Sequence, residues 1–291
     1  MENKIAILTD SNCDLPQEYF KKYPIFKLPL VICCDGAEYR DGINITVQDV
    51  YARQPKENFT TSLPRQQDIA ATLDAMRDAG YTQVIVLLLA GALSGTTNLL
   101  RLIARERKDL DIAVYDTNEA SVGVGILALQ AAQYAARGVP FHLLKKLTAQ
   151  LIADTKVFFS LDALKYLQRG GRIGKATAIA GTLLQIKPIL TFDETGVINT
   201  AAKVRGRMAV TPRLIELVTA LVAARPGVRY NLVVCDGDAP AEGAALRAAL
   251  LKALPSSEQV LHGQLDATLA VHLGPQLLGA GVQFLRSDLP G

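Results

Sequence analysis

The chain has 291 residues, of which 49% are hydrophobic and 20% charged, a composition typical of a folded globular protein of about two domains and not of a disordered one. Its formal net charge of +3 is small for this length, and the Lys and Arg residues are scattered, so we expect no nucleic-acid partner.

The first residues and the cysteines indicate the compartment. The N-terminal sequence MENKIAILTD becomes charged again too soon for a signal peptide, and the longest apolar run, Val84–Leu93, is too short for a transmembrane segment. No two cysteines have C-x-x-C spacing and the three histidines form no H-x-x-x-H pair, which argues against a metal or redox site. We therefore expect a reduced, cytoplasmic protein without a cofactor.

Apolar runs alternate with amphipathic stretches along the first half of the chain, an order typical of strands and crossover helices. The expected strands are Lys4–Thr9, Gln83–Leu89 and Asp111–Tyr115. The expected helices are Gln66–Ala79, Asn98–Lys108, Val122–Arg137 and Leu143–Ala153, the third ending at Gly138-Val139-Pro140.

The second half repeats this alternation. Its expected strands are Val157–Leu161, Lys187–Phe192, Val197–Lys203 and Tyr230–Cys235, and its expected helices are Asp162–Gln168, Lys175–Leu184 and Pro212–Ala224. The whole pattern predicts an α/β fold of two α/β domains with mainly parallel or mixed sheets. We set the domains at residues 1–153 and 154–291, although the junction has no linker composition.

Polar residues follow the first expected strand as Thr9-Asp10-Ser11. The carboxyl ends of strands commonly face a ligand crevice, so these side chains are candidates for binding. The alternative is structural, with Asp10 or Ser11 capping the next turn.

Two further segments carry hydroxyl groups next to an expected helix. Thr60-Thr61-Ser62 precedes a proline and a helix, where Ser or Thr at an N-cap is ordinary but where an anion also binds well. Gly91–Thr97 follows the most apolar strand, and its turn could direct backbone N–H groups and the Ser94 hydroxyl to one anion. A nucleophilic serine is less favoured, because the glycines of G-x-S-x-G are replaced by Ala92 and Thr96.

Two nucleotide motifs fail on their context. Gly123–Ala128 fits G-x-G-x-x-A but lies far from the preceding strand and lacks a following acidic residue, so helix packing is the better explanation for its glycines. Gly174-Lys175 is similar to a P-loop, yet Arg169 stands where the first glycine is needed and Ala176 where Ser or Thr is needed.

Two basic or titratable segments remain. Arg169-Gly170-Gly171-Arg172 is a basic turn, which could equally be a glycine-capped helix end with arginines near its negative dipole. His272 ends a β-like run beside Gly274-Pro275, where a histidine is more often structural than a ligand.

Taken together, these segments resemble the DegV family, the bacterial fatty-acid-binding proteins that carry the lipid for fatty acid kinase. The resemblance extends over nearly the whole chain, and seven segments occur in the family's order: Thr9–Ser11, Thr61–Pro64, Leu93–Thr96, Tyr166–Ile173, Lys187–Leu190, Lys203–Arg207 and His272–Pro275. Arg65 and Gln276 depart from the residues common in the family.

The resemblance implies a ligand tunnel between the two domains, with the fatty-acid carboxylate held near their interface. It assigns the carboxylate to a hydroxyl of Thr61 or Ser62, which it does not distinguish, and to the Ser94-Gly95 turn, with His272 nearby. It also implies that Arg169 and Arg172 lie beside the entrance, where an ATP-dependent kinase subunit would dock. Chain length, unsaturation, oligomeric state and the identity of the kinase stay open.

The residues suit this task physically. Burying a methylene contributes roughly 0.8 kcal/mol, so an acyl tail would supply the affinity. Small and apolar residues could line its channel, although a helix packed on a sheet explains them equally well: Ala178, Gly181, Leu184 and Ile186. The main alternative is an esterase-like hydrolase that uses Ser94 as nucleophile and His272 as base, with Asp10 as the residue that would orient the histidine. A regulatory nucleotide-binding domain is the third, and it is the weakest because both phosphate motifs fail.

Overall fold

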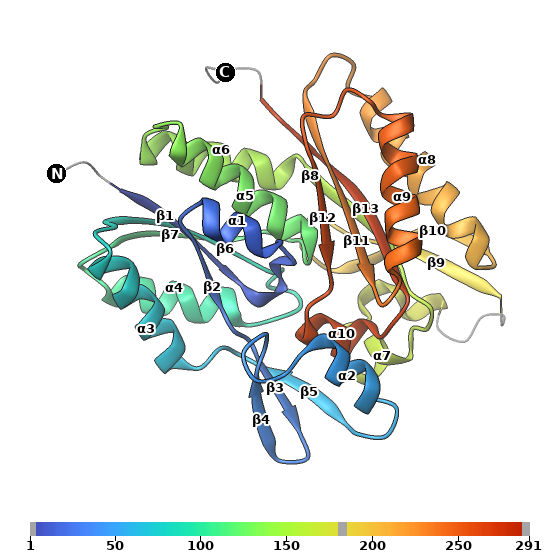
Figure 1. Cartoon of the computed structure of the whole chain (residues 1–291), viewed down its shortest axis with the longest axis horizontal. Helices are drawn as coiled ribbons and strands as arrows, with labels where there is room; N and C mark the ends of the chain where they lie inside the picture. The colour runs from blue at the N-terminus through green and yellow to red at the C-terminus, as the bar shows by residue number, and fades with distance from the viewer. Residues whose placement is uncertain (1–3, 180–184, 287–291) are drawn as a thin grey trace.

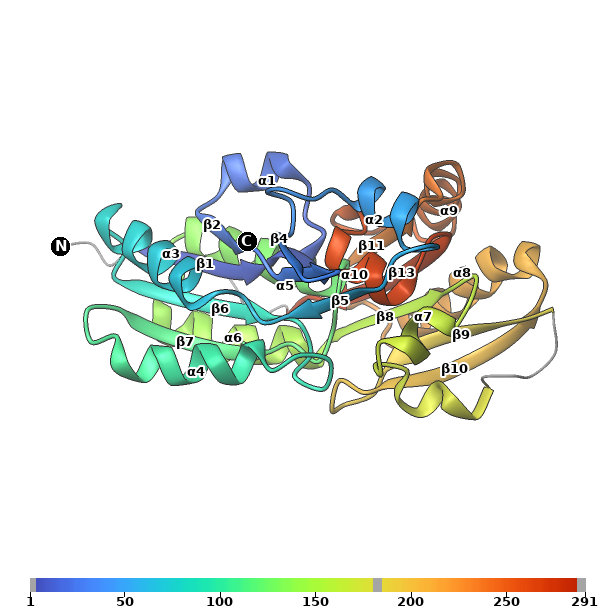
Figure 2. The same ribbon diagram turned by 90° about the horizontal axis from the view of Figure 1, so that it is seen from below.

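The computed structural model describes residues 4–179 and 185–286, which form two α/β domains side by side along the long axis of the molecule (Figures 1 and 2). The described part contains a four-stranded parallel sheet, a six-stranded mixed sheet and a small three-stranded antiparallel sheet. The expected fold class is therefore confirmed.

The parallel sheet has the strand order β2-β1-β6-β7. Its strands are β1 (Ile5–Asp10), β2 (Ile25–Leu28), β6 (Gln83–Leu88) and β7 (Asp111–Asp116). Successive side chains of β1 alternate between two cores, because Ala6 and Leu8 pack toward α3 (Gln66–Asp78) and α4 (Thr96–Glu106), whereas Ile7 packs toward α5 (Val122–Ala136) and α6 (Phe141–Ala153). Both faces are covered, as apolar parallel strands require.

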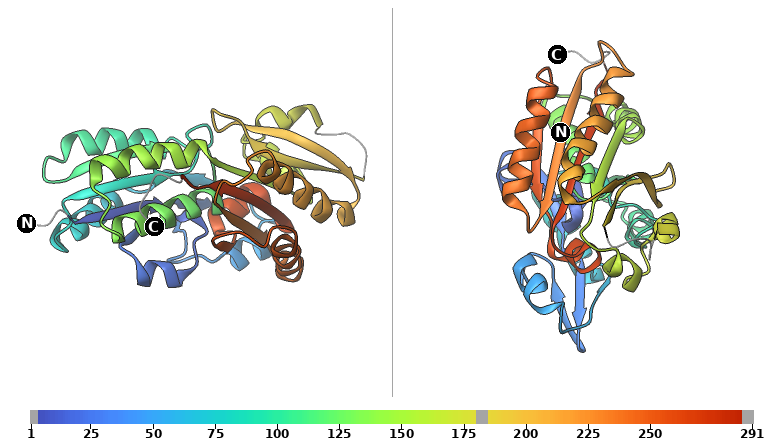
Figure 3. Two further views of the ribbon diagram at one scale, coloured as in Figure 1. Left: turned by 90° about the horizontal axis from the view of Figure 1, so that it is seen from above. Right: turned by 90° about the vertical axis from the view of Figure 1, so that its right-hand side faces the viewer.

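The mixed sheet has the order β10-β9-β8-β13-β11-β12. Its strands are β8 (Thr155–Ser160), β9 (Ile186–Phe192), β10 (Ile198–Arg205), β11 (Tyr230–Gly237), β12 (Val260–Gln264) and β13 (Leu277–Phe284). One face packs on α8 (Val210–Ala223) and α9 (Pro240–Ala253), and the other faces α5 (Figure 3). All strand pairs except β11–β12 are antiparallel.

Helix α5 joins the two domains through one shared core, since it contacts β1 and β6 of the first sheet and β8, β11 and β12 of the second. Its small residues allow this close approach. A Cβ on Gly125 would collide with the carbonyl oxygen of Cys13 in the short 3₁₀ helix η1 (Ser11–Cys13). The packing role expected for Gly123 and Gly125 is thus confirmed.

The small sheet β4-β3-β5 reaches across to the second domain. Strands β3 (Val31–Cys34), β4 (Ala37–Arg40) and β5 (Phe59–Ser62), with α2 (Val47–Arg53), form a separate core with α10 (Ala267–Leu273). Residues from the two ends of the chain therefore meet below the main sheets (Figure 1).

Several element predictions need correction. The run that ends at His272 is the helix α10 and not β-like, and Thr60–Ser62 lie in β5, while the residue at the N-cap of α3 is Arg65. The helix expected at Lys175–Leu184 is described only as the 3₁₀ helix η2 (Gly174–Ile179), because its remainder lies outside the described residues. The remaining short elements are α1 (Gln17–Lys22), α7 (Lys165–Arg169) and η3 (Arg207–Ala209).

The boundary at residue 153 stays a prediction, although α6 ends at Ala153 and β8 begins at Thr155.

No helix within residues 4–179 and 185–286 has the length and apolar character needed to cross a bilayer.

The packing of α5 makes Gly125 less replaceable than Gly123. We expect Gly125→Ala to lower the free energy of unfolding by about 1–3 kcal/mol, because the backbone of Cys13 cannot move away easily. Gly123→Ala should cost less, since its nearest neighbours at 3.0 Å are side-chain atoms of Glu119. Urea unfolding of both variants measures the difference, and an equal loss in the two would contradict this account.

Candidate functional site

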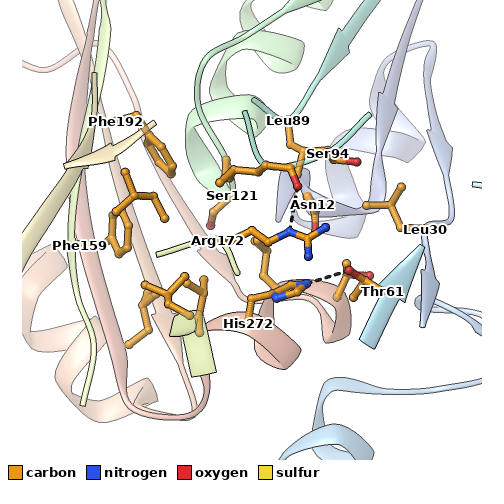
Figure 4. A pocket seen from close by; sticks show the side chains of 18 of the residues that line it. Asn12, Leu30, Thr61, Leu89, Ser94, Ser121, Phe159, Arg172, Phe192 and His272 are labelled. Atoms are coloured by element: carbon orange, nitrogen blue, oxygen red, sulfur yellow. Dashed lines mark hydrogen bonds between the residues drawn. The ribbon is translucent and has the colours of Figure 1, made fainter. Parts of the chain in front are cut away.

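A cavity of about 270 Å³ lies between the two domains. Its polar lining includes Thr61, Ser94, Arg172 and His272, which lie opposite the rings of Phe159 and Phe192 (Figure 4). Ser62 and Gly95 also line the cavity, as do further apolar residues such as Val157 and Ile198. Arg172 is the one permanently charged lining residue in the described part of the chain.

Strand β5 brings Thr61 to this cavity. It pairs antiparallel with β3, with Thr61 opposite Ile32, so its residues alternate between the α10 core and solvent. The Thr61 hydroxyl lies 2.8 Å from Nε2 of His272, and this hydrogen bond joins the two domains (Figure 4). Ser62 is exposed.

Buried carboxylates of the first domain hold the start of α10, which carries His272. Asp41 accepts hydrogen bonds from the N–H groups of Ala267 and Thr268 at 3.2 Å and from the Thr268 hydroxyl at 2.7 Å. Asp14 accepts from the N–H of Asp266 at 2.8 Å. Acceptors and negative charge at a helix start satisfy its free N–H groups, so these bonds fix the position of α10.

His272 is neutral at ordinary pH. Its burial, followed by the charges of Arg172 and Arg169, lowers the pKa of the imidazole from 6.5 to about 4. Nδ1 is buried and has no hydrogen-bond partner among the described residues. Gly170 packs so closely on the ring that a Cβ there would collide with Nδ1, and its φ of −76° shows that glycine is needed for space and not for backbone geometry.

Two aspartates shape the turn that presents Ser94. Asp10 at the end of β1 accepts the N–H of Leu89 at 3.1 Å, and Asp116 at the end of β7 accepts the N–H of Gly91 through both carboxylate oxygens at 3.0 Å. The Ser94 hydroxyl then lies 2.8 Å from that of Thr96. Asp10 also caps η1 through the N–H of Asn12, so the structural explanation for Asp10 is confirmed.

The basic turn after α7 lies at the polar end of the cavity. The N–H of Arg172 bonds to the carbonyl of Leu167, and Gly171 has a φ of +69°, which is a helix end closed by glycine. Arg172 Nε donates to the carbonyl of Leu93 at 3.2 Å, so its guanidinium spans from the second domain to the Ser94 turn. Arg169 is exposed and its guanidinium lies over the Tyr166 ring.

With this geometry in place, the comparisons with known proteins decide the family. A family model described as DegV, a family of uncharacterised proteins, matches residues 4–285. The chain belongs to the DegV family. A DegV domain-containing protein of Clostridium perfringens is 34% identical over 283 residues, which cover 96% of this chain and 98% of that protein.

Solved DegV structures share the fold along their whole length. A DegV family protein of Thermus thermophilus, described as fatty acid binding, has a TM-score of 0.88 and 32% identity over 97% of this chain and 100% of that one. A protein of Eubacterium ventriosum, described as binding stearic acid, has a TM-score of 0.87 and 27% identity, covering 97% and 98%.

The expected carboxylate residues of this DegV chain all line the cavity, as does Arg172. Arg169 does not line it. Of the residues expected along the tail, Gly181 and Leu184 lie outside the described residues, and of Ala178 only the backbone, in η2, is described. Ile186 is half-buried at the start of β9 and does not line the cavity.

Most of the apolar lining was not expected from the sequence. It comes largely from β8, β9, α10 and the residues before α5, through residues such as Ala120, Phe159, Phe192 and Leu269. Leu63, Leu93, Leu167 and Leu273 lie in segments that carry the family resemblance, whereas the other apolar lining residues do not. Strand and helix residues that face a cavity have the same apolar character as those that face a core, so no sequence signal separates the two.

The hydrolase arrangement does not form. His272 bonds to Thr61, Ser94 bonds to Thr96, and Asp10 bonds to backbone N–H groups, so these three residues make no hydrogen-bonded triad in the described structure. The geometry therefore disfavours a Ser94 nucleophile.

One group of potential metal ligands lies outside the cavity, at Cys34, Asp35 and Glu57. Arg53 binds both oxygens of Glu57 at 3.1 Å through Nε, and the Cys34 thiol donates to the same carboxylate. Burial, followed by Glu57, raises the pKa of that thiol to about 11. A neutral thiol and a neutralised carboxylate make a poor metal site.

The lowered pKa of His272 predicts a specific pH dependence. The unfolded chain gains a proton at this residue near pH 6.5 and the folded protein only near pH 4, so the folded state loses stability as pH falls through this window, by on the order of 3 kcal/mol. Denaturation of wild type and His272→Gln across this range isolates the effect, because the buried carboxyls Asp10 and Asp14 titrate in both proteins. The free energy of unfolding of the variant should rise relative to that of wild type as pH falls. A pH-independent difference between the two would contradict a neutral imidazole in the folded protein.

Proposed function

We propose that this DegV protein binds one long-chain fatty acid in the interdomain cavity and presents its carboxylate to an ATP-dependent kinase subunit, which phosphorylates it to an acyl phosphate. The observation that carries the proposal is the division of one cavity into an apolar part and an end lined by hydroxyl groups. The fatty-acid-binding descriptions of the Thermus thermophilus and Eubacterium ventriosum relatives support the ligand class.

The apolar part of the cavity accounts for affinity. A tail of about fifteen methylenes gains on the order of 12 kcal/mol from burial before the costs of binding. A cavity of about 270 Å³ is small among ligand sites, which favours a single narrow ligand over a bulky one.

The polar end accounts for the acidic group. A buried carboxylate without partners would cost several kcal/mol, and the hydroxyls of Thr61 and Ser94 are donors that satisfy its oxygens. Arg172 supplies a positive charge at the same end. Its guanidinium is partly engaged by the carbonyls of Leu93 and Gly170, so it favours negative charge without requiring a tight bidentate pair.

The neutral histidine orients the Thr61 hydroxyl. A buried N–H without an acceptor is rarer than a buried acceptor without a donor, so the unpartnered Nδ1 carries the lone pair and Nε2 carries the proton. Nε2–H then donates to Thr61 Oγ1, and the Thr61 proton is free to donate to the carboxylate. This arrangement favours Thr61 over the exposed Ser62 as the carboxylate ligand.

The position of the polar end supports presentation to a partner. Leu63, which follows Thr61 and Ser62, is 39% exposed, and Arg169, three residues before Arg172, is exposed as well. A carboxylate held there can attack the γ-phosphorus of a nucleotide held by another protein, forming the acyl C–O–P bond and releasing ADP without any proton transfer. Neutral hydroxyl ligands leave the attacking oxygen nucleophilic, and Arg172 can offset the charge that gathers as the phosphoryl group arrives.

Native mass spectrometry of gently purified protein tests the ligand. We expect one bound long-chain acid per chain, intact and extractable, and no covalent labelling by a fluorophosphonate. Absence of lipid after incubation with several fatty acids would overturn the proposal, while labelling at Ser94 would restore the hydrolase.

Paired substitutions test the carboxylate ligands. Thr61→Val keeps the shape of the side chain but removes the donor, so we expect fatty-acid affinity to fall roughly tenfold to a hundredfold, as for a hydrogen bond to a charged group. Ser62→Ala is the matched control and should change affinity less than about threefold. Isothermal titration with palmitic acid measures both, and a larger loss in Ser62→Ala would reverse the assignment.

A further inference from the structure

The end of the cavity opposite Thr61 and His272 is closed by two aromatic rings (Figure 4). Phe159 of β8 and Phe192 at the end of β9 are stacked, with ring centroids 5.5 Å apart and planes inclined by 30°. They are 5% and 4% exposed, so surrounding atoms hold both rings in place. A fatty acid with its carboxylate at Thr61 would meet this pair with its methyl end.

A second cavity of about 520 Å³ lies behind Phe192. It is lined largely by polar and charged residues, including Thr117, Asn118, Glu119, Lys156, Asp193 and Glu194. Phe192 is the one residue in the described part of the chain that lines both cavities.

Adjacent residues of the chain separate the two cavities. Val157 lines the apolar cavity and its neighbour Lys156 the polar one, because successive residues of β8 point to opposite faces. Ala120 and Glu119, before α5, divide in the same way. Phe192 lines both cavities, so its side chain is the one whose truncation can lengthen the apolar cavity toward the polar one.

The polar cavity is unsuitable for a hydrocarbon. The Lys156 ammonium donates to the carbonyl of Phe192. The Glu119 carboxyl is 3% exposed and its Oε2 has no partner among the described residues. A methyl group placed between these polar groups would displace their hydration without offering a hydrogen bond.

We propose that the Phe192 ring sets the maximum acyl chain length, by closing the apolar cavity against the polar cavity behind it. This inference rests on the proposed binding of fatty acids. Each methylene that fits in front of the ring raises affinity about fourfold, and the first methylenes that do not fit add nothing or force the ring aside. The protein therefore selects acids by length through the place where its cavity ends, while the carboxylate ligands are the same for every length.

A competition experiment with straight-chain saturated acids tests this role. Wild type, Phe192→Ala and Phe159→Ala are each incubated with an equimolar mixture of myristic, palmitic, stearic, arachidic and behenic acids, and the bound acids are read by native mass spectrometry. For Phe192→Ala we expect the preferred acid to become longer by at least one member of this series, with arachidic acid gaining roughly tenfold over palmitic acid, which corresponds to about two buried methylenes.

Phe159→Ala is the matched control, because it removes a ring of the same size that lines only the apolar cavity. It enlarges the apolar cavity by one ring but leaves Phe192 in place, so it should lengthen the preferred acid by less than Phe192→Ala does. An unchanged length profile in a folded Phe192→Ala, or an equal shift in Phe159→Ala, would overturn the role of Phe192. If Phe192→Ala does not fold, Phe192→Leu is measured in the same mixture and decides the matter by the same criterion.

Failure of fatty-acid binding and failure of the role of Phe192 give different results in this experiment. If wild type retains none of the five acids, fatty-acid binding itself is wrong and the role of Phe192 is wrong with it. If wild type retains an acid but the variants show the same profile, only the role of Phe192 is wrong.

Discussion

The site depends on one set of buried interactions, the hydrogen bonds by which Asp41 and Asp14 of the first domain hold the start of α10 in the second. Helix α10 carries His272, and β5 carries Thr61, which lies 2.8 Å away. Because the anchoring carboxylates, the helix and the strand come from opposite ends of the chain, neither domain by itself contains a complete site. Carboxylates are well suited here, since they satisfy several free N–H groups of a helix start at once.

These carboxylates are held at a cost that the fold must offset. Burial raises the pKa of Asp14 to about 7, and its hydrogen bonds with Ser121 and Asp266 act in the opposite direction. Such groups are stable only while every partner stays in place. The same requirement that makes the interface sensitive to disruption also gives the hydroxyl end of the cavity a defined geometry.

Much of the fold could be predicted from the sequence, because it depends on local patterns. Apolar runs such as Gln83–Leu88 predict strands of a sheet that is covered on both faces. Amphipathic segments such as Gln66–Asp78 predict helices with one apolar side. The prediction failed at Val271-His272, because a helix of seven residues shows barely two turns of periodicity and its apolar residues pack against both domains. The strand at Thr60–Ser62 was not predicted, because its partner β3 is distant in sequence and nothing local marks the pairing.

The sequence by itself determined the chemistry that this protein can offer: hydroxyl donors at Thr61 and Ser94, a histidine and an arginine, and no motif for binding a nucleotide. Only the tertiary structure decided which apolar residues face a cavity and where that cavity ends. Phe159 and Phe192 belong to strands that also carry core residues such as Phe158 and Leu190, and nothing local distinguishes the two kinds. The reason is physical, because the burial of apolar side chains has no preferred direction. A sequence therefore specifies that a residue is buried. The packing of distant elements decides whether other protein atoms or a ligand cover that residue.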